Sequence, residues 1–370
     1  MTTSHRLIVG CLALFASVPV TVHAGNFYQQ DNLVSDVPGL APSTDTNLKN
    51  PWGIALSPKG PFWVSNQVTG TSTLYNSAGV PLPLVVNIPA GASGPGGGPT
   101  GQVFNNSGDF LLHSGGKALF LFANLDGSIS AWNPAQGSSA QVPVPISSIG
   151  SYTGLAIGNN GSANFLYAAN AQSNKIDVFD GSFAPTSLAG LFSDPNLPAG
   201  FSVYNIQQAG GKLLVSYENT GGSGGVVDAF DFNGNLLQRL AGNGAGGPLD
   251  SPWGMTLAPS SFGEFGGALL VGNEGDGHIS AFNATTGSFL GQLRDGNGNP
   301  ITNTGLWGLT FGNGGNGGSA DKLYFAAGIN DERDGLFGSI SAVPEPSTLL
   351  LFGVGGVVVV AARWSRRRRV

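Results

Sequence analysis

Amide and carboxylate side chains recur at two fixed places beside short apolar runs of this sequence. The residues that precede an apolar run are Asn50, Asp250 and Asn303, and those that follow one are Asn66, Asn124, Asn170, Asn219 and Asn273, with Asn330 and Asp331 as a sixth instance. Glu218 and Glu274 lie beside two members of the second set. Ca²⁺ takes six to eight oxygen ligands of these kinds. A bound divalent ion polarises carbonyl groups, so the pattern permits a hydrolase or a lyase.

The residues that we predict as metal ligands are Asn50, Asp250, Asn273, Glu274 and Asn303. Asparagine also has a purely local role, because it tolerates left-handed backbone and caps turns through its side chain. Repetition in every unit favours that local role, since one ion needs only a few ligands. No catalytic residue stands apart from the repeat, whereas acid–base catalysis usually needs differently tuned groups. The sequence therefore favours a protein that is not an enzyme, and calcium is the one cofactor that the pattern permits.

Other site chemistries find little support in the composition. Cys11 is the only cysteine and lies in the leader described below, which excludes disulfides and thiolate sites from the exported chain. Beyond the leader, His113 and His278 are the only histidines, and neither has a partner at the spacing of a zinc site. The two ends of the chain hold six of the 15 basic residues and only Glu345 of the 21 acidic ones. The remaining body is strongly acidic, so nucleic acid is not an expected partner.

A tryptophan–glycine motif organises the elements that must position these side chains. It occurs as Asn-Pro-Trp-Gly-Ile-Ala-Leu, Ser-Pro-Trp-Gly-Met-Thr-Leu and Gly-Leu-Trp-Gly-Leu-Thr-Phe, with two weaker copies. The glycines of these copies are Gly53, Gly101, Gly154, Gly254 and Gly308. The step of 100 residues between the third and fourth conceals a degenerate copy at 204–207. Six units of roughly fifty residues indicate a repeat architecture. Because the tryptophans recur at one position, we expect them to pack between units rather than to form a sugar-binding surface.

Each unit contains period-two apolar alternation between turns rich in Gly, Asn and Asp, which is the signal of antiparallel strands. Four strands in each of six units predict an all-β fold, a six-bladed β-propeller over residues 25–343. The last unit stops after three strands, at Val343, and the segment Asp31–Asp36 precedes the first unit. We therefore expect this segment to supply the outer strand of the sixth blade and close the ring, which removes exposed strand edges.

Residues 1–24 have the features of a secretory signal peptide, predicted to be helical and to be cut by signal peptidase after Ala24. His5 and Arg6 form its basic start, the apolar core follows, and Val-His-Ala supplies the small residues of a cleavage site.

Residues 344–370 differ in character from the body. Pro344, Glu345 and Pro346 precede a predicted hydrophobic helix of fourteen apolar or glycine residues, and a cluster of arginines ends the chain. The apolar run is short for a stable membrane span, and the arginines favour the cytoplasmic side. The tail resembles the PEP-CTERM sorting signal. That resemblance implies recognition by an exosortase-type membrane protease, transient membrane anchoring, and delivery to the cell surface or the extracellular space.

The body resembles a family of uncharacterised exported bacterial proteins with NHL-like propeller repeats. The resemblance depends on the tryptophan–glycine motifs and on the segment Phe122–Pro134, and it implies fold and export without a known activity. Our interpretation is a binding or scaffold protein, with a polysaccharide among its possible partners. The alternative is a calcium-dependent hydrolase or lyase, similar to gluconolactonase-like propellers, that uses the channel mouth.

Overall fold

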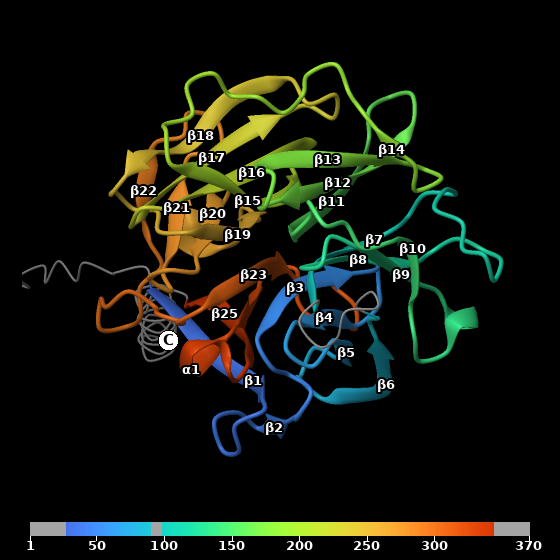
Figure 1. Cartoon of the computed structure of the whole chain (residues 1–370). Coiled ribbons are helices and arrows are strands. Elements are labelled where there is room, and N and C mark those ends of the chain that lie inside the picture. The colour runs from blue at the N-terminus through green and yellow to red at the C-terminus, as the bar shows by residue number, and fades with distance from the viewer. Residues whose placement is uncertain (1–26, 90–97, 344–370) are drawn as a thin grey trace, which may run out of the picture. The chain divides into compact units, whose positions relative to one another are not determined.

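The computed structural model describes residues 27–89 and 98–343, apart from the side chain of Asn243, and these residues form a six-bladed β-propeller around a central channel (Figure 1). The first three blades are β3 (Pro51–Leu56), β4 (Phe62–Asn66), β5 (Thr71–Tyr75) and β6 (Pro81–Asn87); β7 (Pro99–Phe104), β8 (Phe120–Asn124), β9 (Ile129–Trp132) and β10 (Gln141–Val144); β11 (Tyr152–Asn159), β12 (Asn164–Asn170), β13 (Lys175–Asp180) and β14 (Pro185–Thr186). The predicted all-β class and blade number are confirmed.

Blades four to six complete the ring. They are β15 (Phe201–Ala209), β16 (Lys212–Asn219), β17 (Gly224–Phe230) and β18 (Leu236–Ala245); β19 (Pro252–Leu257), β20 (Leu269–Asn273), β21 (Ile279–Phe282) and β22 (Phe289–Gln292); β23 (Leu306–Phe311), β24 (Leu323–Ala327) and β25 (Leu336–Val343) with β1 (Phe27–Ser35) and β2 (Ser43–Thr44). Three short helical turns lie in loops: η1 (Pro134–Gln136), η2 (Gly263–Phe265) and α1 (Ile329–Glu332).

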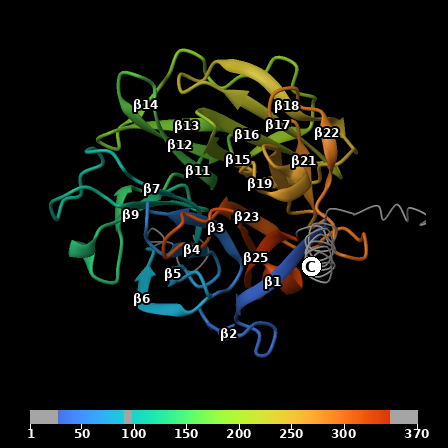
Figure 2. The same ribbon diagram turned by 180° about the vertical axis from the view of Figure 1, so that it is seen from behind.

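The N-terminal strand closes the ring as the sequence predicts. β1 runs antiparallel to β25, with register partners from Phe27 and Val343 to Ser35 and Leu336, and the two strands lie side by side in both views (Figure 1 and Figure 2). The strand is longer than the predicted segment 31–36, and the parallel pairing of β2 with β1 makes this sheet five-stranded. The buried Tyr28 side chain anchors the closing strand, because its ring packs on Phe262 and its hydroxyl donates to the Phe262 carbonyl at 3.2 Å.

The repeat glycines lie where neighbouring inner strands approach each other most closely. A Cβ on Gly53 would overlap the backbone around Gly101, and a Cβ on Gly101 would overlap the backbone of Gly154 and Leu155. Gly254 and Gly308 meet the next inner strand in the same way. Glycine is therefore required at these positions by the closure of the ring and not by a turn.

Blade four lacks this glycine yet has four strands, although the register of β17 with β18 shifts at three places. Asn205 takes its place, and its side-chain amide donates to the Trp253 carbonyl of the next inner strand at 2.6 Å. A hydrogen bond thus replaces the close backbone contact. The degenerate copy changes the joint between blades four and five without interrupting the propeller.

Apolar faces pack between adjacent blades. Trp63 of blade one stacks on Phe120 of blade two with ring centroids 4.0 Å apart, and Phe62 packs on Tyr324 and Phe337 of blade six. An aromatic side chain buries roughly 150–250 Å² in a protein interior, so such contacts stabilise the blades against one another.

The predicted signal peptide with its cleavage site at Ala24, and the sorting segment with Pro344, Glu345 and Pro346, lie outside the described residues. The domain boundaries at 24/25 and 343/344 stay predictions. Within the residues that the structure describes, no helix has the length and apolar character needed to cross a membrane.

Candidate functional site

The predicted polar residues gather on one face of the propeller, which we call the upper face. The start of each inner strand is the register partner of the end of the second strand, as in Pro51 with Asn66 and Pro252 with Asn273. Because these pairings repeat around the ring, the loops into the inner strands and the loops after the second strands open on the same side. The sequence placed both loop types at the channel mouth correctly.

Four aromatic side chains fill the channel just below this mouth, and we call them the aromatic plug: Trp52, Tyr204, Trp253 and Trp307. Trp52 stacks on Trp307 with centroids 3.6 Å apart and an interplanar angle of 14°, and Trp253 meets both rings edge-on. The three tryptophans are only 2–6% exposed. They pack as predicted, but they meet across the channel from blades one, five and six, and they offer no open surface for a sugar ring.

Three glutamates lie near the hydroxyl of Tyr204, on the upper side of the plug. Glu218 is in the turn-side end of β16, Glu274 directly follows β20, and Glu332 lies in α1 after β24, and each adds to the negative potential at the Tyr204 hydroxyl. Burial, reinforced by these charges, raises the pKa of Tyr204 well above its usual range. We call Glu218, Glu274, Glu332 and Tyr204 the glutamate triad site.

The site raises the pKa of each of its carboxyl groups. Burial raises the pKa of Glu274 to about 7, and the nearby charges of Glu332, Glu218 and Asp250 act in the same direction against a hydrogen bond with Tyr204. Burial also raises the pKa of Glu218, and that of Glu332 despite a hydrogen bond from Asn50. Perturbed carboxyl groups in a cleft are typical of functional sites.

The loops that build this mouth adopt left-handed backbone at residues other than glycine. Asn330, Asp331 and Glu332 have φ values of 56°, 55° and 63°, so α1 is a left-handed turn. Asn50 and Ser251, which precede inner strands at the same face, have φ values of 43° and 48°. Such conformations cost of order 1–3 kcal/mol each and concentrate at functional sites. Left-handed residues other than glycine also occur at the opposite face, as at Phe110 and Phe183, so this strain accompanies the carboxyl groups without singling out their face.

An open depression of about 940 Å³ lies next to Glu274 and Glu332. Two basic side chains line it, but both are paired: Lys49 with Asp36 at 2.5 Å and with Asp334 at 3.2 Å, and Arg333 with Asp331 at 2.8 Å. Since the bases are matched by these aspartates, the two glutamates leave the depression acidic.

The structure brings only some of the predicted metal ligands together. Asp250 and Glu274 lie close enough for their charges to interact, and the Glu274 amide donates to the Ser251 carbonyl at 2.9 Å. Asn273 is fully buried, and its amide donates to the Pro248 carbonyl at 3.0 Å. These three residues belong to the mouth of blade five.

Asn50 and Asn303 are engaged elsewhere. The Asn50 side-chain oxygen accepts the indole N–H of Trp307 at 3.0 Å, and its amide donates to Glu332 at 3.1 Å. Asn303 forms a reciprocal amide pair with Gln30 of the closing strand. The described part of the chain holds no group of three or more His, Cys, Asp or Glu side chains arranged for a metal ion.

Sequence reasoning missed two members of the glutamate triad site. It named Asn330 and Asp331 as the sixth-blade instance, whereas the neighbouring Glu332 is the residue that reaches the site. It noted Tyr204 only as part of the degenerate repeat. The acidic residues at 331–332 and the irregularity at 204 were the available signals.

Comparison with known proteins identifies a sorting motif at the C-terminus and relatives over most of the chain. Residues 342–369 match the model of the PEP-CTERM protein-sorting motif, which indicates an exported protein sorted to the cell envelope. Uncharacterized protein R648 of Acanthamoeba polyphaga mimivirus is 31% identical over 337 residues, covering 83% of this chain and 78% of that protein. Uncharacterized protein L690 of the same virus is 29% identical, covering 83% and 84%.

Solved structures share the fold at low sequence identity. A protein of unknown function from Bacteroides thetaiotaomicron has a TM-score of 0.54 and 10% identity, with 85% of this chain and 73% of that chain covered. The PQQ-bound aldose sugar dehydrogenase of Streptomyces coelicolor has a TM-score of 0.53 and 13% identity, covering 86% and 99%. A streptogramin B lyase has a TM-score of 0.50 and 13% identity, covering 86% and 98%. At such identities these likenesses establish the propeller fold alone.

Proposed function

This chain belongs to the family of the uncharacterized mimivirus protein R648, and from that premise we propose that it is an exported binding protein whose ligand site is the glutamate triad site. The observation that carries the proposal is that three glutamates, from the upper ends of three consecutive blades, lie near the hydroxyl of the buried Tyr204. Loss of solvation and mutual repulsion both disfavour the charged forms of these carboxyl groups. A ligand that offsets their repulsion would therefore bind there favourably.

The location follows from the tail. The PEP-CTERM motif implies processing by exosortase-type machinery. We propose in addition that signal peptidase removes residues 1–24, that the tail anchors the chain in the membrane transiently, and that the propeller ends at the cell surface or in the extracellular matrix. Polysaccharide is an abundant ligand class in such a matrix.

The ligand that best suits the site is a glycan that carries ammonium groups. Carboxylates accept hydrogen bonds from hydroxyl groups, and an ammonium group would offset the mutual repulsion of Glu218, Glu274 and Glu332. The depression of about 940 Å³ beside the site falls within the size range of small-molecule pockets and has room for a few sugar rings. The rigid plug beneath keeps the carboxyl groups at the mouth.

Calorimetric titration with a glucosamine tetramer, compared with its N-acetylated counterpart, tests this proposal. We expect saturable binding of the amine form, at least tenfold weaker in Glu274→Gln and in Glu332→Gln. Glu264→Gln is the matched control, because this exposed glutamate lies in η2, in the loop between the first and second strands of its blade, on the opposite face. Equal binding of both tetramers, or binding unchanged by the two variants, would show that the triad does not select a cationic glycan.

A second candidate is a hydrolase or a lyase at the same site, and one observation favours it. The pKa of Glu274, at about 7, suits a general acid or base at neutral pH, while Glu218 and Glu332 lie nearby as further carboxyl groups. Product release from an amine-bearing polysaccharide or from a lactone by the wild-type protein, abolished in Glu274→Gln, would favour this function over binding alone.

Calcium at this mouth stays a prediction. The side-chain oxygens of Asn50 and Asn303 already accept hydrogen bonds, so Asp250, Asn273 and Glu274 are the predicted ligands that remain. Calcium takes six to eight oxygens, and backbone carbonyls and waters would have to supply the others. Calorimetry with millimolar CaCl₂ tests the prediction, and a heat of binding that disappears in Asp250→Asn would support it.

A further inference from the structure

The last strand of the propeller leads away from the glutamate triad site. β25 begins at Leu336, the register partner of Ala327 at the mouth, and ends at Val343, the partner of Phe27 at the start of β1. The 8 residues of β25 span about 25 Å at the rise of a β-strand. Both Phe27 and Val343 therefore lie toward the face opposite to the mouth, which we call the lower face.

Only a short link separates Val343 from the apolar run of the tail. This link consists of residues 344–348 and contains two prolines. An extended chain from Val343 to Leu349 reaches at most about 22 Å. While the apolar run is held in a membrane, the lower end of β25 must therefore stay within about that distance of the membrane surface.

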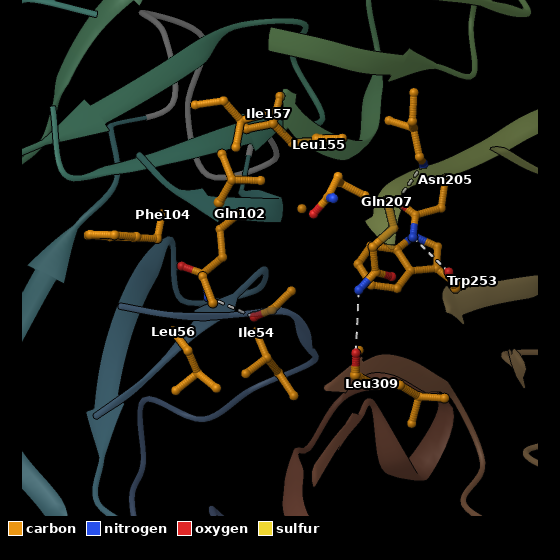
Figure 3. A pocket seen from close by; sticks show the side chains of 18 residues that line it. Ile54, Leu56, Gln102, Phe104, Leu155, Ile157, Asn205, Gln207, Trp253 and Leu309 are labelled. Carbon is orange, nitrogen blue, oxygen red and sulfur yellow. Dashed lines mark hydrogen bonds between the residues drawn. The ribbon is translucent and has the colours of Figure 1, made fainter. Parts of the chain in front are cut away.

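The other blades are tied to blade six, so the link restrains the whole propeller. Beneath the aromatic plug the inner strands of all six blades line a cavity of about 230 Å³ (Figure 3). In its wall the side-chain oxygen of Gln207, from blade four, accepts the Met255 amide of blade five at 3.0 Å. The Gln207 amide donates to the Leu309 carbonyl of blade six at 3.4 Å (Figure 3). Such bonds hold the blades together across the channel.

Charge distinguishes the two faces. At the upper face Lys49, Lys175 and Arg333 each pair with an aspartate, and the three glutamates of the glutamate triad site add further negative charge. The lysines in or beside the loops of the lower face are Lys59, Lys117, Lys212 and Lys322. The acidic residues in or beside those loops are Asp109, Asp180, Asp231, Glu264 and Asp321. The lower face is therefore close to neutral, whereas the upper face is acidic.

Three of these lysines lie with two exposed apolar side chains on neighbouring blades. Lys322 belongs to blade six, Lys59 to blade one and Lys117 to blade two. Val80, in the loop between β5 and β6, is 49% exposed, and Leu111, in the loop between β7 and β8, is 65% exposed. We call these five residues the basal patch. Lysines together with exposed apolar side chains suit the interface of an anionic membrane.

We propose that the basal patch rests on the membrane surface while the tail anchors the chain, so that the glutamate triad site opens away from the membrane. The inference rests on the transient anchoring proposed above. Anionic lipid headgroups attract the lysines of the patch. The opposite orientation would bring the carboxylates of the mouth within the screening length of the lipid phosphates, where like charges repel. The proposed ligand site is thus accessible before the tail is cut.

Position-specific fluorescence quenching on vesicles tests this orientation. Cys11 is the only cysteine, so a single new cysteine in a Cys11→Ser background can carry a fluorophore. Leu111→Cys in the basal patch and Ile149→Cys in a loop of the upper face are matched sites, because both native side chains are 65% exposed. Each labelled full chain is reconstituted with vesicles of three parts phosphatidylcholine to one part phosphatidylglycerol that contain a lipid with a quencher on its headgroup. We expect quenching at position 111 to be at least threefold stronger than at position 149.

Flotation of the labelled chains with the vesicles separates the two ways in which the inference could fail. A chain that does not float with the vesicles would refute the transient anchoring and the orientation with it. A chain that floats but is quenched equally at both positions, or more strongly at position 149, would refute the orientation alone.

Charge reversal tests the role of the patch itself. Lys59→Glu should lower the quenching at position 111 at least twofold, because it places a carboxylate against the anionic surface. Lys212→Glu is the matched control, since Lys212 lies at the lower face of blade four, outside the basal patch. Equal quenching in the two variants would overturn the assignment of the basal patch to the membrane.

Discussion

Replacement of Glu274 by glutamine should stabilise the protein at alkaline pH. In the folded chain burial raises the pKa of Glu274 to about 7, from an ordinary value of 4.5. The folded state therefore holds a proton that the unfolded state releases as pH rises above 4.5. The free energy of unfolding therefore falls as the pH rises from 4.5 to about 7, and the whole loss is present above pH 7.

The size of the effect follows from the pKa difference. At 1.36 kcal/mol for each pH unit, the difference corresponds to about 3 kcal/mol. Because the carboxyl group is partly open to solvent, screening should reduce this to about 2 kcal/mol. Glutamine has nearly the same shape and carries no charge, so Glu274→Gln should show this gain at pH 8 and lose it at pH 4.

Denaturant unfolding at pH 4, 6 and 8 measures this directly. The wild type will keep a pH dependence of its own, because burial raises the pKa of Asp228 to about 7 as well. The informative quantity is therefore the difference between variant and wild type at each pH. Glu264→Gln, on the opposite face, should have nearly the same free energy of unfolding as the wild type at each pH. A stability difference between Glu274→Gln and the wild type that does not change from pH 4 to pH 8 would refute the account of the glutamate triad site.

Three further predictions concern the propeller itself and use thermal or denaturant unfolding. Gly101→Ala should lower the free energy of unfolding by about 1–3 kcal/mol, because the added Cβ would overlap the next inner strand. Gly108→Ala is the control and should be nearly neutral, because a Cβ there meets open space. Equal effects of the two substitutions would contradict the role of the repeat glycine. Tyr28→Ala should cost about 3–5 kcal/mol through loss of a buried aromatic anchor, and an unchanged midpoint would contradict closure by β1. Trp307→Ala should cost a similar amount and raise the exposure of Trp52, measured by fluorescence quenching; unaltered quenching would contradict the stacked pair.

The architecture could be predicted from the sequence because its cause is local and repeated. The spacing of Gly53, Gly101 and Gly154 reports the close approach of inner strands, which every blade must achieve in the same way. Alternating apolar residues identified the strands, and the missing outer strand of the last unit identified the closing role of the N-terminal segment. The position of both loop types at one face followed from the same periodicity.

The composition of the site could not be predicted in this way, because it depends on departures from the repeat. Glu332 reaches the mouth through three consecutive left-handed residues, and Tyr204 belongs to the one unit whose glycine is replaced. Asn303, which the repeat placed among the metal ligands, pairs with Gln30, more than 270 positions away in the chain. Periodicity reports what the blades have in common. Which side chains meet at the channel axis, how strongly burial shifts their pKa values, and where the plug divides the channel depend on contacts between distant blades, and only the tertiary structure decides those.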